Sequence, residues 1–300
     1  MKIFVRDHNS VLKDLKDDFE LVGIDQAERV VLWNDVLPME RGIIQYAKSR
    51  GVPTIVMQHG RRGTSRYYPP FNEKIQADKL LVWGENDKKA LIEAGQEPSK
   101  IRVTGTTVLS NLPKAYPANE LGRTEGLTIV FSPEHWDGPI KENTRVRDEL
   151  RKLDTPFPIT TKIIDSPSHQ GIEWDNPLLT KRSDLNHLDV CKELLTRAMV
   201  VVGVSESTLE LMAQAMGIPV VIAEDWEPKP SGGDMRYLTY RRVISPASKR
   251  AKLHELNEVI LSQIYGGHND LKKEREEIAI LDGGINLNAR ELIRQEIINV

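Results

Sequence analysis

Cysteine is almost missing from this sequence of 300 residues, in which Cys191 is the single example. One thiol excludes an internal disulfide framework and a metal site made of several cysteines. A chain without disulfides suits a reducing compartment. We therefore expect a cytoplasmic protein, either free or bound peripherally to a membrane surface.

Long apolar runs are missing too. No stretch reaches the roughly 18 apolar residues that a membrane-spanning helix needs, and the opening MKIFVRDHNS turns polar too early for a secretory signal peptide. We expect no transmembrane segment. Neither sign of charge is in large excess, since 41 basic and 44 acidic residues give a net charge of −3. This balance disfavours a nucleic acid as partner without eliminating a local basic patch.

Several catalytic motifs do not occur. The sequence has no G-x-G-x-x-G, which disfavours NAD binding, and no G-x-x-x-x-G-K-[ST], which disfavours a phosphate-binding-loop nucleotide hydrolase. It also lacks H-E-x-x-H and G-x-S-x-G, the motifs of zinc proteases and α/β-hydrolases. We expect neither a cofactor nor a resident metal.

Short apolar runs alternate with segments of helical spacing along the chain, which is typical of β-α-β units and parallel sheets. Glycine, proline or aspartate bounds each run. The fold class is therefore α/β with doubly wound sheets. Strands are expected at residues 2–5, 30–33, 54–58, 80–83, 101–104, 127–131, 157–164, 199–202 and 220–223, and helices at 11–21, 39–50, 86–94, 143–153, 188–196 and 207–216.

A stretch of little periodicity that contains Pro113 and Pro117 separates two such series. We expect an amino-terminal Rossmann-like domain over residues 1–110, a linker over 111–122 and a carboxy-terminal Rossmann-like domain over 123–300. Helices over residues 253–265 and 288–298 are expected to close the second domain. Ligands of doubly wound sheets lie beyond the carboxyl ends of the strands, so the loops there are the candidate sites.

The first candidate is the run IVMQHGRRGT, where an apolar strand ends in polar and basic residues. His59 at the strand end is a candidate general base, because a neutral imidazole can take a proton from a hydroxyl. Arg61, Arg62 and Arg66 are candidates for binding phosphates or a charged acceptor. The alternative is that His59 belongs to an ordinary turn and the arginines to a solvated face.

The second candidate is the hydroxyl-rich turn of GVSESTLE, between an apolar strand and a helix. Ser205, Ser207 and Thr208 lie where the helix begins, and the free N–H groups and positive dipole end there attract anions. Glu210 lies about one turn inside, where it can accept hydrogen bonds from sugar hydroxyls. The alternative is that a serine is simply the helix cap and the glutamate complements the dipole.

The run STLELMAQAMGIPVV at 207–221 resembles the nucleotide-sugar half of GT-B glycosyltransferases and of the related non-hydrolysing UDP-N-acetylglucosamine 2-epimerases. The resemblance implies that Ser207 and Thr208 hold the donor diphosphate and that Glu210 meets the ribose hydroxyls. QHG at 58–60, ADKLLVWGENDKKALIEAG at 77–95 and KIRVTGT at 100–106 are similar to bacterial surface-polysaccharide and CDP-glycerol-type transferases.

Two loops of the second domain add candidates through the same resemblance. SPEHWD follows the first strand of that domain, and the family places this loop at the cleft between two domains, so Glu134 and His135 are expected to contact the sugar or phosphate. EDWEPKP matches the acidic sugar-binding loop in its position, which makes Asp225 a candidate for hexose hydroxyls. The alternative for the first loop is that Trp136 packs there. Lys162 is a weaker candidate for phosphates.

The resemblance implies two Rossmann-like domains that face a cleft, and transfer of a sugar from a UDP-linked donor to a hydroxyl, with His59 as general base. No D-x-D metal motif is present, which favours metal-independent transfer. A polysaccharide or lipid-linked precursor is the expected acceptor. The alternatives are a UDP-GlcNAc 2-epimerase-like isomerase and a CDP-glycerol-type polyol-phosphate transferase. Glu206 within the hydroxyl turn departs from the family pattern.

Overall fold

The computed structural model describes residues 1–6, 15–33, 38–58, 74–109, 112, 126–133, 140–164, 172–180, 187–204, 207–223, 246–266 and 271–300. The chain divides into two compact units. The first contains residues 1–110 and 280–300, and the second contains residues 111–279. Among the described residues, no helix has both the length and the apolar character to cross a membrane.

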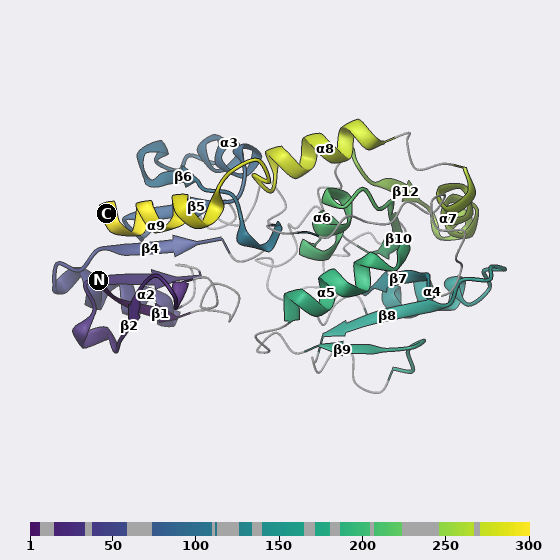
Figure 1. Ribbon diagram of the computed structural model, residues 1–300, viewed down its shortest axis with the longest axis horizontal. Helices are drawn as coiled ribbons and strands as arrows, with labels where there is room; N and C mark the ends of the chain where they lie inside the picture. Colours follow the sequence, from purple (N-terminus) through teal and green to yellow (C-terminus); the bar gives the residue numbers. More distant parts are fainter. Residues whose placement is uncertain are drawn as a thin grey trace, which may run out of the picture. The chain divides into compact units, whose positions relative to one another are not determined.

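The first unit is built on a sheet of six parallel strands in the order β2-β1-β3-β4-β5-β6 (Figure 1). Helices α2 and α3 pack on one face through Ile44, Ala47 and Leu91, and α9 packs on the other face. The elements are β1 (Lys2–Arg6), β2 (Glu20–Leu21), β3 (Arg29–Leu32), α2 (Pro38–Ser49), β4 (Thr54–Met57), β5 (Lys79–Val82), α3 (Glu85–Glu93), β6 (Ile101–Val103) and α9 (Ala289–Asn299).

The second unit has a parallel sheet in the order β12-β11-β10-β7-β8-β9. Helices α4 and α7 pack on one face of this sheet, while α6 packs on β10 and β11 and against α5. The elements are β7 (Thr128–Ser132), α4 (Ile140–Leu150), β8 (Ile159–Ile164), β9 (Leu178–Thr180), α5 (His187–Thr196), β10 (Ala198–Gly203), α6 (Thr208–Ala215), β11 (Val220–Ala223), β12 (Lys249–Ala251), α7 (Leu256–Tyr265) and α8 (Lys272–Leu281).

The strand sequences explain this arrangement. VVL in β3 and MVVV in β10 are apolar on consecutive residues, and their side chains alternate between the two faces of the sheet. Such runs are stable only where helices cover both faces, as they do here. The expected α/β class with two doubly wound, Rossmann-like sheets is therefore confirmed.

The last helix belongs to a different unit from the one expected. The sequence suggested that residues 123–300 form one domain, but residues 280–300 belong to the first unit. Ala289, Ile293 and Ile297 of α9 form one apolar stripe and join the core around Ile3 and Ile55. Near the amino terminus, residues 20–21 form β2, where we had expected the end of a helix.

Three glycines hold the segment between α8 and α9 against the carboxyl ends of β5 and β6. A Cβ atom added to Gly84 would lie 1.9 Å from the Leu281 carbonyl oxygen, and one added to Gly105 would lie 2.9 Å from that of Gly284. Gly284 itself has a φ of +58°, and an added Cβ would lie 2.5 Å from the Trp83 oxygen. Only glycine permits backbones to approach this closely.

The two units repeat one β-α-β segment. In the first, β3-α2-β4 ends in GVPTIV at 51–56, and in the second, β10-α6-β11 ends in GIPVVI at 217–222. Val52 N–H donates to the Ala47 carbonyl (2.9 Å), and Ile218 N–H donates to the Ala213 carbonyl (2.8 Å). The intervening glycines, Gly51 and Gly217, both have positive φ angles. Both helices thus end in the same way before the next strand.

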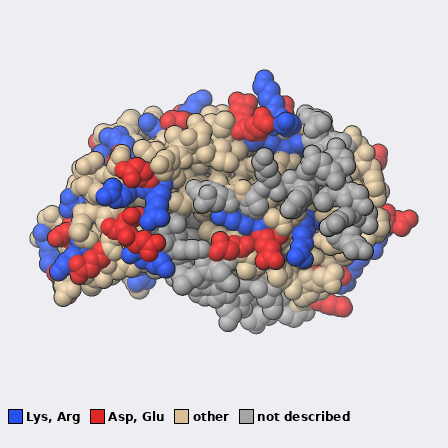
Figure 2. Space-filling view, viewed as in Figure 1, with Lys and Arg blue, Asp and Glu red and all other residues tan. Residues whose placement is uncertain are grey.

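On the face shown in Figure 2, basic and acidic side chains of the described residues are interspersed. No broad region of one sign is visible among them on this face. The picture agrees with the net charge of −3.

The close backbone approach at Gly84, Gly105 and Gly284 leads to a stability prediction. Replacing Gly284 by alanine forces a Cβ atom into the Trp83 carbonyl at a positive φ, and we expect a loss of about 1–3 kcal/mol of unfolding free energy. Gly23→Ala is the matched control, because Gly23 has a φ of −64° and nothing within 4 Å of an added Cβ. Chemical denaturation measures both variants. Equal denaturation midpoints for the two variants would contradict the claim that the backbone contact at Gly284 requires a glycine.

Candidate functional site

The carboxyl edge of the second sheet carries the topological switch point of that unit. β7 pairs with β8 on one side and with β10 on the other, and Ser132 at the end of β7 is the register partner of Gly203 at the end of β10. From β7 the chain continues to β8 and β9 on one side of β7, and it then crosses to β10 on the other side. Ligands of doubly wound sheets bind at such a point, outside the carboxyl ends of the strands.

The turn that follows β10 begins helix α6 with Ser207 as the N-cap residue. The Ser207 hydroxyl oxygen accepts a hydrogen bond from Leu209 N–H at 3.2 Å. In return, the backbone N–H and the hydroxyl of Ser207 donate to Glu210 Oε2 at 2.7 and 2.5 Å. This is a capping box. Ser207 is therefore a helix cap, as the structural alternative stated, and Thr208 is the first residue of the helix.

Glu210 is completely buried, with 0% of its surface exposed. Among the described residues, none forms a hydrogen bond with its Oε1 atom, although Oε2 is held by Ser207. Burial raises the pKa of Glu210, against the hydrogen bonds from Ser207 and Ser132, which lower it. A buried carboxylate oxygen without a donor is costly, and a ligand hydroxyl is one group that would satisfy it.

Lys162 on β8 is buried near the same edge. The register of β7 and β8, which pairs Phe131 with Thr161, places Lys162 beside Ser132 on the neighbouring strand. Burial raises the pKa of the Cys191 thiol, the adjacent Lys162 ammonium lowers it and the Glu210 carboxylate raises it. The Lys162 ammonium and the Glu210 carboxylate therefore both lie close enough to Cys191 to influence its thiol.

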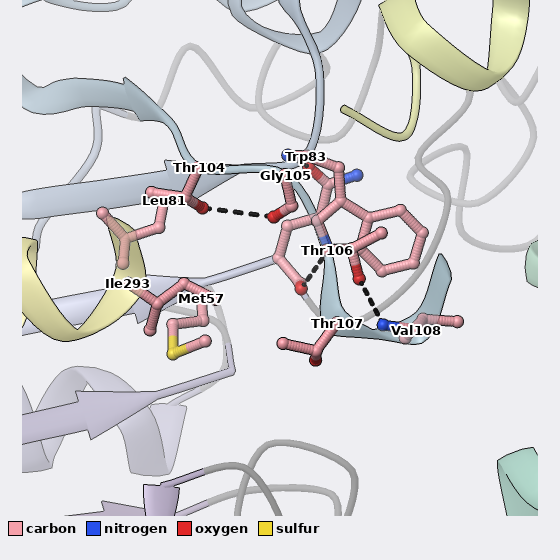
Figure 3. A pocket seen from close by; sticks show the side chains of 10 residues that line it. Met57, Leu81, Trp83, Thr104, Gly105, Thr106, Thr107, Val108 and Ile293 are labelled. Atoms are coloured by element: carbon pink, nitrogen blue, oxygen red, sulfur yellow. Dashed lines mark hydrogen bonds between the residues drawn. The ribbon is translucent and has the colours of Figure 1, made fainter. Parts of the chain in front are cut away.

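A pocket lies at the carboxyl ends of β4, β5 and β6 in the first unit (Figure 3). The space in it that admits the centres of water-sized molecules is only about 20 Å³. Apolar side chains line it from Met57, Leu81 and Ile293. The rest of its wall comes from the residues that follow the three strands: Gln58 after β4, Trp83 after β5, and Thr104, Gly105, Thr106, Thr107 and Val108 after β6. The Thr106 hydroxyl oxygen accepts a hydrogen bond from Val108 N–H at 3.1 Å.

Gln58 explains part of the polar strand end in IVMQHG. Its side-chain oxygen accepts the Trp83 backbone N–H at 2.9 Å, and its backbone oxygen accepts the Trp83 indole N–H at 2.8 Å. Its amide nitrogen donates to Asp87 Oδ2 at 2.8 Å. Gln58 therefore fixes a wall of the pocket by joining β4 to the segment after β5, a role that the sequence analysis did not predict.

Most of the other predicted site residues cannot be placed. Eight of them lie outside the described residues and stay predictions: His59, Arg61, Arg62, Arg66, Glu134, His135, Ser205 and Asp225. Within the described part of the chain, no group of three or more His, Cys, Asp or Glu side chains is arranged to hold a metal ion. The predicted residues that the structure does bring together are Ser207, Thr208 and Glu210 at the start of α6.

No protein-family model matches this chain, and no curated protein matches it. Solved structures do. The UDP-GlcNAc 2-epimerase of Neisseria meningitidis bound to UDP-GlcNAc superposes with a TM-score of 0.57 at 15% identity, over 97% of this chain and 80% of that one. The wall teichoic acid polymerase TagF gives a TM-score of 0.60 at 11% identity, over 99% and 88% of the two chains.

Anabaena Alr3699/HepE in complex with UDP and glucose is also similar, with a TM-score of 0.52 at 14% identity over the full length of both chains. At these identities the similarity establishes the fold and nothing finer. It agrees with the two doubly wound sheets and with the expectation from the sequence. The chain has the GT-B fold, with two Rossmann-like units.

Proposed function

We propose that this protein transfers a sugar from a nucleotide-sugar donor to a hydroxyl acceptor without a metal ion. The observation that carries the proposal is the start of α6, where a buried glutamate with one unsatisfied oxygen lies at the topological switch point of the second sheet. Proteins of the same fold have been crystallised with UDP-GlcNAc, with UDP-glucose and with UDP.

The donor diphosphate would lie at the amino-terminal end of α6. The positive end of the helix dipole favours an anion there, and the sequence analysis assigns Ser207 and Thr208 of this turn to the diphosphate. Lys162 supplies a positive charge near the same edge. As the bond between the sugar carbon and the diphosphate oxygen breaks, these groups would stabilise the negative charge on the leaving diphosphate.

Glu210 would then bind the nucleoside. Its Oε2 atom stays with Ser207, and its partnerless Oε1 atom accepts a ribose hydroxyl. A hydrogen bond to a buried carboxylate is among the stronger ones. Binding of the nucleoside would therefore supply a donor to Glu210 Oε1.

The remaining roles rest on the sequence prediction. The acceptor hydroxyl attacks the sugar carbon and gives its proton to His59, and Arg61, Arg62 and Arg66 bind phosphates of the donor or acceptor. Glu134, His135, Ser205 and Asp225 complete the donor site. UDP is the proposed nucleotide, because the related structures with a named nucleotide contain UDP.

Two rival activities have specific support. Epimerases are among the similar structures, so incubation with UDP-GlcNAc and no acceptor would reveal isomerisation. The sequence also resembles CDP-glycerol-type transferases at 58–60, 77–95 and 100–106, so release of CMP from a CDP-linked polyol, with no UDP release from UDP-sugars, would identify polyol-phosphate transfer.

The donor proposal predicts selective binding of uridine nucleotides. A ligand that binds only the native state raises the melting temperature, so UDP and UDP-sugars should do so and NAD should not. Glu210→Gln removes the charged hydroxyl acceptor and should weaken UDP by about tenfold or more, while leaving inorganic pyrophosphate unaffected. Glu258→Gln is the matched control, because Glu258 is also the third residue of its helix but is exposed.

Binding of UDP and pyrophosphate is measured by isothermal titration calorimetry. An equal loss of affinity for both ligands in Glu210→Gln would assign Glu210 to the helix cap alone. Stabilisation by NAD but not by UDP would place the protein outside nucleotide-sugar chemistry.

The burial of Glu210 predicts a pH dependence of stability. The pKa of Glu210 is higher in the folded state than in the unfolded state. Its contribution to the unfolding free energy is therefore fully present below the pKa of the unfolded state and is lost as the pH rises through the pKa of the folded state. The unfolding free energy of the wild type should therefore fall over this window, by at most about 1.4 kcal/mol per pH unit for one proton. Glu210→Gln should lack this pH-dependent part of the unfolding free energy. Urea denaturation at several pH values measures it in both proteins, and the same pH slope in both would contradict the assignment to Glu210.

A further inference from the structure

The first unit has a topological switch point of its own. β1 pairs with β2 on one side and with β3 on the other, and Arg6 at the end of β1 is the register partner of Leu32 at the end of β3. Helix α2 is the next helix after β3. The position corresponds to the β7–β10 edge of the second unit.

A buried glutamate occupies the start of α2. Glu40 is 2% exposed, and its Oε1 atom accepts a hydrogen bond from Arg6 Nε at 3.2 Å. Its Oε2 atom is buried and has no hydrogen-bond partner within the described part of the chain. The Arg6 side chain is 42% exposed. A carboxylate oxygen left this way is destabilising unless a ligand supplies the donor.

Glu40 and Glu210 lie at similar places in the repeated β-α-β segment, although α2 is four residues longer than α6. Each is the third residue of the helix that follows the strand beyond the switch point, and each helix leads to a glycine of positive φ, a proline and the next strand. Each also has one oxygen paired and one oxygen buried without a partner. The partner differs, because Ser207 holds Glu210 and an arginine holds Glu40.

The difference in partner sets the ligand chemistry. Glu40 Oε2 can accept a hydrogen bond from a hydroxyl. The guanidinium of Arg6 carries five N–H donors, and Nε is the one that Glu40 uses. Its terminal nitrogens match the two oxygens of a phosphate or carboxylate.

We propose that Arg6 and Glu40 form a second binding site in the first unit, for the acceptor, and that this site takes a hydroxyl compound that carries a phosphate. Glu40 accepts the hydroxyl proton in a hydrogen bond, and Arg6 pairs with the phosphate. Calling this ligand the acceptor depends on the proposed sugar transfer, whereas the proposal that Arg6 and Glu40 bind a ligand does not.

Calorimetric titration with glycerol 3-phosphate, inorganic phosphate and glycerol tests this assignment on the full chain. Glycerol 3-phosphate should bind most tightly. Glu40→Gln should weaken the binding of glycerol 3-phosphate by about tenfold and that of inorganic phosphate far less. The reason is that the variant loses the carboxylate that accepts a hydrogen bond from the ligand's hydroxyl group. Arg6→Lys should weaken both phosphates, because an ammonium cannot pair in the same bidentate way.

Arg102→Lys is the matched control. Arg102 is 42% exposed like Arg6 and forms a 3.7 Å ion pair with Glu296 in the same unit. This variant should leave all three titrations unchanged. UDP should bind the Arg6 and Glu40 variants like the wild type, which separates this site from the donor site.

Should Glu40→Gln fail to fold, the wild type supplies the second test. The Nε–Hε signal of Arg6, assigned with Arg6→Lys, should shift in an NMR titration with glycerol 3-phosphate. Absence of binding by glycerol 3-phosphate at millimolar concentration, or an unshifted Arg6 signal, overturns the proposal. A loss of UDP affinity in Arg6→Lys overturns it too, because the phosphate would then belong to the donor.

Discussion

The capping box between Ser207 and Glu210 is the interaction on which the second unit's candidate site depends. Two donors from Ser207 hold one oxygen of a carboxylate that has no access to water, and the other oxygen has no partner. The same bonds fix where α6 begins and therefore where the positive end of its dipole lies. Helix cap and ligand site are thus compatible readings of one turn, since the cap occupies Oε2 and leaves Oε1 for a hydroxyl.

The repeated β-α-β segment gives this interaction a counterpart in the first unit. Glu40 and Glu210 are each the third residue of their helix, and both lie at the edge where a doubly wound sheet binds ligands. Arginine in place of serine as the partner adds a positive charge at Arg6. Under the two proposals, each unit would bind one phosphate-bearing ligand beside a buried glutamate.

Much of the fold could be predicted from the sequence. VVLW, TIVM, LLVW, TIVF, MVVV and VVIA predicted buried parallel strands, and the run from Ser207 to Gly217 predicted α6 with its cap. The short strands β2 and β12 were not predicted, because their two or three residues carry little pattern. The apolar stripe of α9 predicted a packed helix but not the sheet it packs on, because periodicity does not specify the partner. Glu40 follows no hydroxyl turn, so no motif marked it, and the clamp formed by Gln58 depends on Trp83 and Asp87, which are distant in sequence.

A crystal structure of the protein with UDP tests the central claim most directly. The diphosphate should lie at the amino-terminal end of α6, and a ribose hydroxyl should donate to Glu210 Oε1 while Ser207 keeps Oε2. UDP bound elsewhere, with the start of α6 covered by packed side chains and Glu210 unchanged, would contradict it.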